Sequence, residues 1–423
     1  MAKEEKIIDI DQKKILVGLD LGSSKIEVFI GQIEDDGEIR ILGFGNPPLN
    51  KGEDNELEAT IRTLKVAVEA AERTSGIDVK DVYVGIAGSN IRSLESRATI
   101  ALRDFGGVVT REAMDRVVEQ ASALVQKPAD MEIIHVLQDD YSLDDRNGLK
   151  NPLGMEGVSL SIKVQLVLAQ RVIIRNIHKA IEGAGLSVKG LVLEPLADAA
   201  CVLEKEEKEL GVAIVDIGAT STDVAVFKED KVVYTRSFNL AGNAITNDIA
   251  VGLTTPMARA EEIKKMYGTC RRSNMIDDIS FTVPGIGGRP GKECSRKHLA
   301  FIIYCRMEGI LKTVRDDLQQ KNFDSLLGAG IVITGGTSLL EGTEELAEEV
   351  FHGRAVRLGG PNKSGKGLNE VTRMPTHSTG VGLLYYAAME SISQERRETR
   401  TTKIVGSVGN GWKRVLNFLK NYI

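Results

Sequence analysis

Two short segments each combine an aspartate, a glycine turn and hydroxyl side chains. The candidate residues are Asp20, Gly22, Ser23, Ser24 and Lys25 in the first segment, and Asp216, Gly218, Thr220 and Thr222 in the second. A tight glycine turn between strands exposes successive backbone N–H groups that bind phosphate oxygens, and hydroxyls add further donors. An aspartate at the end of a strand can hold Mg²⁺ through its water ligands, because Mg²⁺ keeps much of its hydration shell. Two such turns facing each other would hold the phosphates of a nucleotide from both sides.

The two segments lie within a longer repeat. Lys14–Gly45 and Gly211–Gly242 each contain an apolar run that ends in aspartate, the glycine turn, a second alternating run, a charged turn and a third strand. Aligning Asp20 with Asp216 separates the copies by 196 residues, which is too long for a solenoid period. The pattern therefore predicts two related domains, each starting with a β-hairpin sheet. Asp-x-Gly alone is also a common hairpin turn, but its duplication favours the functional interpretation.

A third glycine turn follows the apolar run 330–334. Gly335 and Gly336 precede Thr337 and a helix expected over about 341–350. Paired glycines let the backbone approach a flat ligand closely, and adenine or ribose would fit such a site. An ordinary connection between a strand and a helix would show the same pattern.

A fourth glycine-rich segment, residues 360–366, matches most of a P-loop. Gly367 stands where that motif requires Ser or Thr to hold Mg²⁺, and no amphipathic helix pattern follows it. We interpret the segment as a flexible loop.

Length and composition limit the possible classes of protein. The chain has 423 residues, which predicts two or three domains at about 150 residues each. Hydrophobic residues make up 42% and the net charge is −6, so the chain can form a sizeable core and is not expected to bind nucleic acid. The four cysteines form no C-x-x-C pair, which argues against a structural zinc site. The start of the chain lacks the apolar stretch of a signal peptide, and no run approaches about eighteen apolar residues.

The three turns, in this order and spacing, resemble the motifs of the actin/Hsp70/sugar-kinase superfamily of ATP-binding proteins. GLDLGSSK (18–25) is similar to its first phosphate motif, VDIGATSTDVAVF (215–227) to the second, and VITGGTSLLEG (332–342) to the adenosine motif. The resemblance implies an α/β, actin-like (ribonuclease H-like) fold of two lobes with ATP and Mg²⁺ bound between them. Lys25 would contact a phosphate, although a solvated hairpin lysine is the alternative.

The resemblance also assigns roles to particular residues. Asp20 and Asp216 would hold the metal ion, and Asp216 would also be a catalytic residue. Glu194, in the segment LEPLADAA, would orient the attacking water. Glu261 and Lys264 lie at i and i+3 on one face of an expected helix, at positions that the superfamily uses for the ribose and base. Hydrolysis would be slow at most.

Within the superfamily, the chain is most similar to the FtsA family of actin-like membrane tethers in bacterial division. The similarity depends on LAGNAITNDIAVGL (240–253), VPGIGGRP (283–290) before a long helix, GAGIVITGG (328–336) and an amphipathic C-terminus, and it covers about 15–388 plus the tail. It implies a protein that forms filaments with itself on the cytoplasmic face of the membrane at the division site. Its partner would be the C-terminal peptide of FtsZ.

The resemblance places the FtsZ peptide on a subdomain at about 241–325. Arg306, on the helix expected over 295–320, is the candidate contact for this acidic peptide. A basic residue on an amphipathic helix is otherwise simply exposed. Other division proteins would bind an inserted subdomain, expected at 79–167.

The sequence pattern predicts the internal structure of this insert. It contains the run VYVGIAGS (82–89), an alternating run at 96–103, a helix capped by Thr110 and strands near 131–139 and 158–168. The whole predicted organisation is lobe 1 (1–78 and 168–193), the inserted α+β subdomain (79–167), lobe 2 (194–390), a flexible linker (391–409) and an amphipathic membrane helix (410–423).

The C-terminal segment GWKRVLNFLKNYI has one apolar and one polar face at about 100° per residue. The apolar arc contains Trp412, Val415, Leu416, Phe418, Leu419, Tyr422 and Ile423, and the cations of the polar arc are Lys413, Arg414 and Lys420. A short helix with a cationic polar face and an aromatic residue near its start is typical of an interfacial helix on an anionic membrane surface. A helix docked on the protein's own core is the alternative.

Two other functions on the same fold stay open from the sequence. The chain could be an ATP-binding adaptor of the pilus-assembly type, whose relatives usually end without an amphipathic anchor. It could also be a small-molecule kinase, which would need its own catalytic base. A chaperone of the Hsp70 type would need a substrate domain, for which the residues after Ala388 are too few.

Overall fold

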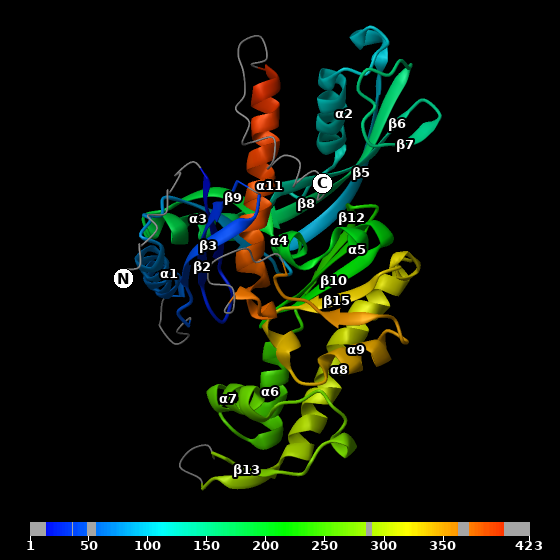
Figure 1. Ribbon diagram of the computed structural model, residues 1–423. Helices are drawn as coiled ribbons and strands as arrows, with labels where there is room; N and C mark the ends of the chain where they lie inside the picture. The colour runs from blue at the N-terminus through cyan, green and yellow to red at the C-terminus, as the bar shows by residue number, and fades with distance from the viewer. Residues whose placement is uncertain (1–13, 36, 49–55, 285–289, 363–371, 402–423) are drawn as a thin grey trace, which may run out of the picture.

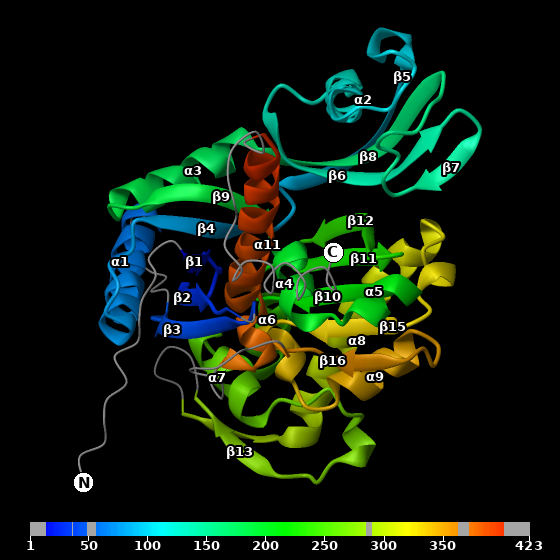
Figure 2. The ribbon, with the colours of Figure 1, turned by 45° about the horizontal axis from the view of Figure 1, so that its top comes forward.

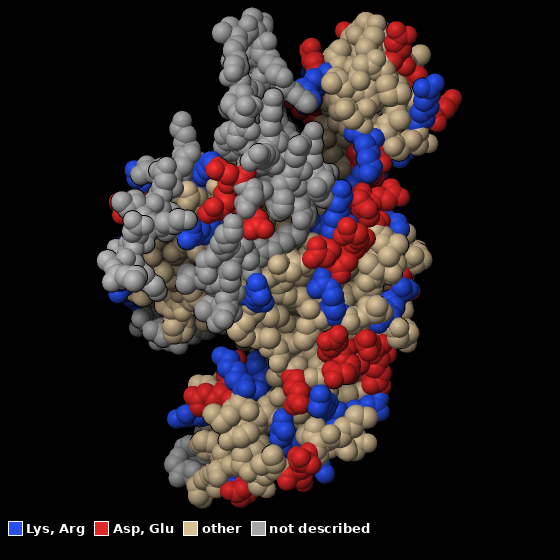
Figure 3. All heavy atoms as spheres, in the orientation of Figure 1, with Lys and Arg blue, Asp and Glu red and all other residues tan. Residues whose placement is uncertain are grey.

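Two lobes and one inserted domain make up the described part of the chain (Figures 1 and 2). The computed structural model describes residues 14–35, 37–48, 56–284, 290–362 and 372–401, with the side chains of the last helix described as far as Ser391. Each lobe contains a five-stranded sheet, and two helices, α4 (Glu194–Val202) and α11 (Ser378–Thr401), lie between the lobes. In the described ranges, no helix is long and apolar enough to cross a bilayer. On the face in Figure 3, acidic and basic side chains are interspersed.

The lobe 1 sheet has the strand order β3-β2-β1-β4-β9. β1, β2 and β3 are antiparallel neighbours, whereas β4 and β9 run parallel to β1. The strands are β1 (Ile15–Asp20), β2 (Glu27–Ile33), β3 (Ile39–Gly45), β4 (Asp81–Ile86) and β9 (Ser187–Leu193), and the helices are α1 (Glu56–Ser75) and α3 (Arg171–Gly183). α1 and α3 cover one face of the sheet and α11 covers the other. Both faces of the strands are therefore buried, and the strand sequences are nearly continuously apolar.

The lobe 2 sheet has the order β12-β11-β10-β15-β16, with the same pattern of directions as lobe 1. The strands are β10 (Val212–Ile217), β11 (Thr222–Lys228), β12 (Lys231–Phe238), β15 (Gly330–Thr334) and β16 (Val356–Leu358). The helices are α5 (Lys205–Leu210), α6 (Gly242–Leu253), α7 (Met257–Tyr267), α8 (Arg296–Gln320) and α9 (Thr343–Val350), with a hairpin of β13 (Ser280–Val283) and β14 (Lys292–Ser295) beside them. The matching topology confirms the predicted two-lobe α/β fold.

The inserted domain is an antiparallel sheet of order β5-β8-β6-β7 covered by α2. Its elements are β5 (Ile91–Ala101), α2 (Arg111–Leu124), β6 (Met131–Leu143), β7 (Arg146–Leu149) and β8 (Ser159–Gln170). The Thr110 hydroxyl accepts a hydrogen bond from Ala113 N at 3.1 Å and so caps α2, as predicted.

The structure corrects the start of the insert. We expected residues 79–167 to form it, but β4 lies in the lobe 1 sheet between β1 and β9, and the insert sheet starts at Ile91. Alternation and apolar character show that residues 81–86 form a strand. They carry no information about which sheet the strand joins, because that depends on its neighbours in space.

The structure also corrects the end of lobe 2. We expected 194–390 to belong to it, but α11 packs on β1 and β2 of lobe 1 and against α4. A Cβ atom at Gly382 would lie 2.1 Å from the Ala197 carbonyl oxygen, so only glycine lets α11 approach α4 this closely.

Residues 391–409 were expected to form a flexible linker, yet α11 continues through Thr401. Residues 394–398 (QERRE) are good helix formers, and extending an existing helix avoids the unfavourable nucleation step. The predicted membrane helix at 410–423 lies outside the described residues.

Candidate functional site

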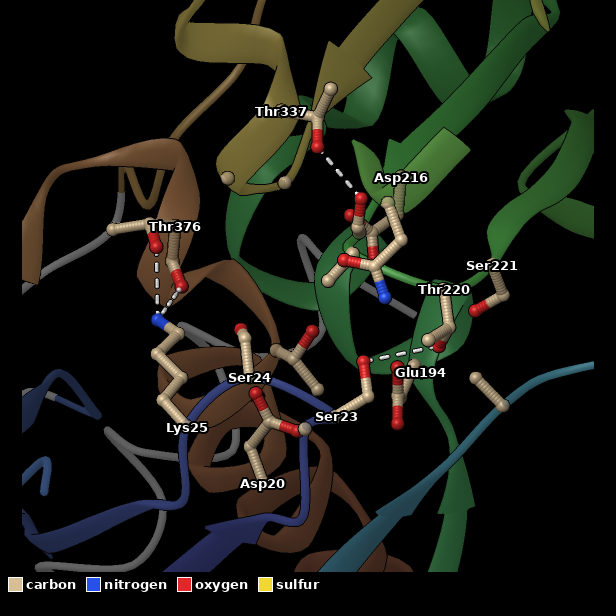
Figure 4. Close-up of a pocket in the computed structure, with 18 of the residues that line it drawn as sticks. Asp20, Ser23, Ser24, Lys25, Glu194, Asp216, Thr220, Ser221, Thr337 and Thr376 are labelled. Atoms are coloured by element: carbon tan, nitrogen blue, oxygen red, sulfur yellow. Dashed lines mark hydrogen bonds between the residues drawn. The ribbon is translucent and has the colours of Figure 1, made fainter. Parts of the chain in front are cut away.

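A cavity of about 1320 Å³ lies between the two lobes. It is lined by nearly all of the residues that the sequence singled out for nucleotide binding. These are Asp20, Gly22, Ser23, Ser24, Lys25, Glu194, Asp216, Gly218, Thr220, Glu261, Lys264, Gly335, Gly336 and Thr337. The two repeated turns approach it from opposite lobes, at the ends of β1 and β10 (Figure 4). The fold therefore brings three distant motifs to one place.

The two turns touch each other directly. The Thr220 hydroxyl donates a hydrogen bond to the Ser23 hydroxyl at 3.1 Å, and Figure 4 shows the two side chains facing each other. A second bond ties the third turn to the second, because Thr337 Oγ1 donates to the Gly218 carbonyl at 2.7 Å. Backbone and hydroxyl donors from three segments thus surround one space, which suits a ligand with several phosphate oxygens.

Lys25 extends to the rim of this space. Its Nζ donates to the Thr376 carbonyl at 2.6 Å and to Thr376 Oγ1 at 2.9 Å (Figure 4). The same Nζ forms an ion pair with Glu27 at 2.7 Å. Glu27 is fully buried, and its Oε1 also lies 2.8 Å from His377 Nδ1. Lys25 therefore joins lobe 1 to the segment before α11, and its ammonium group also borders the cavity.

Buried carboxylates give the site its electrostatic character. Burial raises the pKa of Asp20 to about 7, and the nearby Glu27 adds to this effect. Burial raises the pKa of Asp216 to about 8, with further contributions from Asp223 and Asp20. The pKa of Glu194 is raised well above its usual value, mainly by burial and then by the charge of Asp20. Ionisation of the carboxylates in such a cluster is unfavourable unless a cation lies among them.

This donor set fits Mg²⁺. Carboxylate oxygens are its preferred ligands, and Mg²⁺ usually takes only one or two of them beside water and phosphate oxygens. In the part of the chain that the structure describes, no three His, Cys, Asp or Glu side chains are arranged to bind a metal by themselves. Asp20 and Asp216, one from each lobe, are therefore the residues that would hold the ion together with phosphate and water.

Glu261 and Lys264 lie on α7 at the far side of the cavity. They form an ion pair at 2.7 Å, and Lys264 also donates to Thr246 Oγ1 at 2.9 Å and to the Gly242 carbonyl at 3.2 Å. Gly335 also lines the cavity; it has φ +88°, and a Cβ atom there would lie 2.0 Å from Asp216 Oδ1. The wall is polar at α7 and bare backbone at Gly335, which suits a sugar hydroxyl and a flat base.

One predicted phosphate ligand does not line the cavity. Thr222 is fully buried and its hydroxyl donates to the Leu240 carbonyl at 2.7 Å. It starts β11 at the position that corresponds to the buried Ile26 in lobe 1, so its side chain faces the interior rather than the turn. Side chains alternate between faces along a strand, which explains the error.

Several residues that contribute to the site were missed. Thr376 and Ser221 line the cavity, and Asp223 and Asp198 are buried carboxylates close enough to raise the pKa of Glu194. Asp223 could have been found, because it lies opposite Asp216 in the repeated hairpin. The contribution of Thr376 depends on how the segment before α11 folds back, and the sequence shows no sign of this.

The predicted partner residue, Arg306, is not among the residues that line the cavity. Arg306, on α8, is partly exposed and forms a bidentate ion pair with Asp248 at 2.5 and 3.0 Å. The expected membrane residues from Trp412 to Ile423 lie outside the described ranges.

Comparison with known proteins gives matches along most of the chain. A family model described as "Cell division protein FtsA" matches residues 213–382, and one described as "SHS2 domain inserted in FTSA" matches residues 88–168. The "Cell division protein FtsA" of Pseudomonas aeruginosa is 41% identical over 380 residues, which cover 89% of this chain and 90% of that protein. The protein of the same name from Escherichia coli K12 is 33% identical over 424 residues, covering 98% and 99%.

Solved structures match the fold. The structure "PilM-PilN type IV pilus biogenesis complex" has a TM-score of 0.61 at 17% identity, covering 88% of this chain and 98% of that one. The structure of MreB5 of Spiroplasma citri bound to ADP has a TM-score of 0.50 at 14% identity, covering 92% and 99%. These likenesses confirm the predicted actin-like architecture.

Proposed function

The chain belongs to the FtsA family and so acts in cell division, and on that premise we propose that it binds Mg²⁺ and ATP, polymerises at the membrane and holds FtsZ there. The observation that carries the nucleotide part is the meeting of two equivalent Asp-Gly turns, one from each lobe, across one cavity. MreB5, which shares the fold, has been solved with ADP.

Each wall of the cavity has its own role in this proposal. Gly22–Lys25 and Gly218–Thr220 would bind the phosphates, and Asp20 and Asp216 would hold Mg²⁺, which neutralises phosphate charge when it is bound. Gly335, Gly336 and Thr337 would receive the adenosine, with Glu261 and Lys264 on the ribose and base. Glu194 would orient the attacking water, so hydrolysis would depend on this side chain more than binding would.

Titration calorimetry tests the nucleotide site. Wild-type protein should bind Mg·ATP, and Asp216→Ala should bind it much more weakly while keeping its fold. Glu119→Ala, which removes an exposed carboxylate on α2 outside the cavity lining, is the matched control. Equal affinity for all three proteins would contradict the proposed phosphate site.

Glu194 offers a separate test of the chemical step. Glu194→Ala should keep its affinity for Mg·ATP and lose any measurable hydrolysis in a single-turnover assay, because positioning a water matters only for the reaction. A parallel loss of affinity would instead assign Glu194 to binding.

The proposed FtsZ site lies on α8. Arg306 keeps 37% of its side chain exposed beside Asp248, so its guanidinium can meet an acidic peptide. Arg306→Ala should weaken binding of the C-terminal FtsZ peptide and leave ATP affinity unchanged. Lys312→Ala, on the same helix and 45% exposed, is the matched control. Equal peptide affinity for both variants would place the site elsewhere.

The proposed membrane contact is the C-terminal segment. Each cation contributes about 1 kcal/mol on an anionic leaflet, and partial burial of the apolar arc must add the rest, so one tail is marginal and a filament of many tails would bind firmly. Deleting 411–423 or making Trp412→Glu should abolish sedimentation with anionic vesicles. Lys413→Gln with Arg414→Gln should weaken it mainly at low salt. Unchanged sedimentation of the deletion variant would refute the tether.

Self-assembly and the wider partners complete the proposal. Electron microscopy of the protein with Mg·ATP on anionic lipid should show filaments. The insert, which the SHS2 family model matches over 88–168, is the proposed surface for other division proteins. Filaments that form equally without lipid and nucleotide would contradict the coupling of polymerisation to both.

A further inference from the structure

A histidine of the insert contacts the residue that precedes Glu194, and Glu194 lines the nucleotide cavity. His135, on β6, accepts a hydrogen bond at its Nε2 from the backbone N–H of Leu193 at 2.9 Å. Its Nδ1 lies 3.4 Å from the hydroxyl of Tyr386 on α11. Leu193 ends β9 and Glu194, which lines the cavity, is the first residue of α4. One side chain of the insert therefore contacts the residue before Glu194.

The position of β9 explains why an acceptor is needed there. β9 is the edge strand of the lobe 1 sheet, and N–H groups that point away from an edge need a partner outside the sheet. An acceptor at Nε2 requires the neutral ring with its proton on Nδ1, where it can be donated to the Tyr386 oxygen. Burial lowers the pKa of His135 to about 4, which keeps this form at neutral pH.

The insert is also attached to lobe 2. Lys231, on the edge strand β12, pairs with Asp140 at 2.5 Å and Asp139 at 3.3 Å of β6. Ser93 of β5 shares a hydrogen bond with Thr235 of β12. In Figure 2, the insert lies above the lobe 2 sheet and beside β4 and β9 of lobe 1. A movement of one lobe against the other must therefore strain or shift β6, the strand that bears His135.

We propose that His135 is a positioning residue that couples the insert to the nucleotide cavity. It holds the backbone at the junction of β9 and α4, where Glu194 is the first residue of the helix. The proposal rests on the nucleotide site proposed above. A small displacement of β6 would shift the first turn of α4, and a displacement of about 1 Å at a reacting group is enough to change a rate strongly. Coupling between two sites is reciprocal, so a nucleotide in the cavity must also alter the insert.

Hydrogen exchange of three full-length variants tests the coupling. His135→Phe keeps the ring size and removes the acceptor, whereas His135→Gln keeps an acceptor at nearly the same reach. Tyr386→Phe removes the other ring contact and leaves Nε2 in place, so it is the matched control. In His135→Phe, the Leu193 amide should exchange about five- to tenfold faster than in wild type, the effect of one lost hydrogen bond.

The decisive measurement compares exchange in 131–138 with and without saturating Mg·ATP. Wild type, His135→Gln and Tyr386→Phe should show a nucleotide-dependent change in β6, and His135→Phe should lose it while calorimetry shows ATP still bound. A change in β6 that persists in His135→Phe, or no change in wild type that binds ATP, would overturn the coupling. A failure of His135→Gln to restore it would show a merely structural role. Wild-type protein that binds no ATP would refute the proposed function itself, and calorimetry separates that outcome from the others.

Discussion

The turn between β1 and β2 and the turn between β10 and β11 share one backbone plan but treat their buried acids differently. Asp20 lies opposite Glu27 in the first hairpin, and Asp216 lies opposite Asp223 in the second. The residue two positions before the second acid is Lys25 in lobe 1 and Ser221 in lobe 2. The two buried acids therefore lie in different electrostatic surroundings.

In lobe 1 the second acid has basic partners. Glu27 is fully buried and pairs with Lys25, and His377 lies against the same oxygen. In lobe 2 the second acid depends on dipoles, because Asp223 accepts hydrogen bonds from the Ser221 hydroxyl at 2.7 Å and from Gly88 N at 3.3 Å. Burial raises the pKa of Asp223 above its usual value. Lobe 1 thus supplies its own cation, whereas lobe 2 would depend on the Mg²⁺ that we propose binds with the nucleotide.

The largest expected effect is on the lobe 1 pair. Lys25→Met leaves Glu27 buried without its ammonium partner and should lower the free energy of unfolding by about 3 kcal/mol, since breaking a buried ion pair is strongly destabilising. Urea unfolding without nucleotide measures this free energy. Adding Glu27→Gln to Lys25→Met should recover much of the loss, and a double variant as unstable as the single one would show that Lys25 acts mainly through Thr376.

The next effect tests the equivalence of the two turns. Asp20→Asn and Asp216→Asn should each lower the affinity for Mg·ATP by about 10- to 100-fold, the size of effect seen when a group that orients a metal's ligands is lost. Calorimetry with and without Mg²⁺ measures both. If only one variant loses affinity, the two lobes do not share the metal, and the symmetry of the turns is structural.

A smaller effect is expected on the lobe 2 acid. Ser221→Ala removes a hydroxyl that donates to the buried Asp223 and should cost about 1 kcal/mol of stability. This is well below the loss expected for Lys25→Met, because Gly88 still donates to the other oxygen. Similar losses for both variants would show that a hydroxyl and an ammonium serve the two hairpins equally well.

The smallest expected effect is an increase in stability rather than a loss. The pKa of Asp223 is higher in the folded than in the unfolded chain, so the folded state binds the proton more tightly and its stability falls as pH rises from about 4. Asp223→Asn removes this dependence and should raise the melting temperature slightly at pH 7.5 and less at pH 4.5, in protein freed of Mg²⁺ and nucleotide. Glu27→Gln should instead lower the melting temperature at neutral pH. Asp223→Asn that destabilises at pH 7.5 would refute the contrast between the lobes.

The sequence by itself determined the repeated hairpins and the residues at their turns. Apolar alternation, the glycines and the aspartates at strand ends are local features, and the same local rules act on both copies. The cavity residues from Asp20 to Lys25 and from Gly335 to Thr337 could therefore be predicted without a structure. The exception is Thr222, where the alternation of faces along one strand placed a hydroxyl inside rather than at the turn.

Only the tertiary structure decided which distant segments meet. It placed β4 in the lobe 1 sheet and packed α11 against lobe 1. It also brought Thr376 within hydrogen-bond distance of Lys25, and His135 within hydrogen-bond distance of the Leu193 amide. Each of these contacts joins residues that are far apart in the chain and depends on how sheets and helices pack. A local pattern specifies the element and the face that a side chain takes, but the partner of that face is set by the packing of the whole chain.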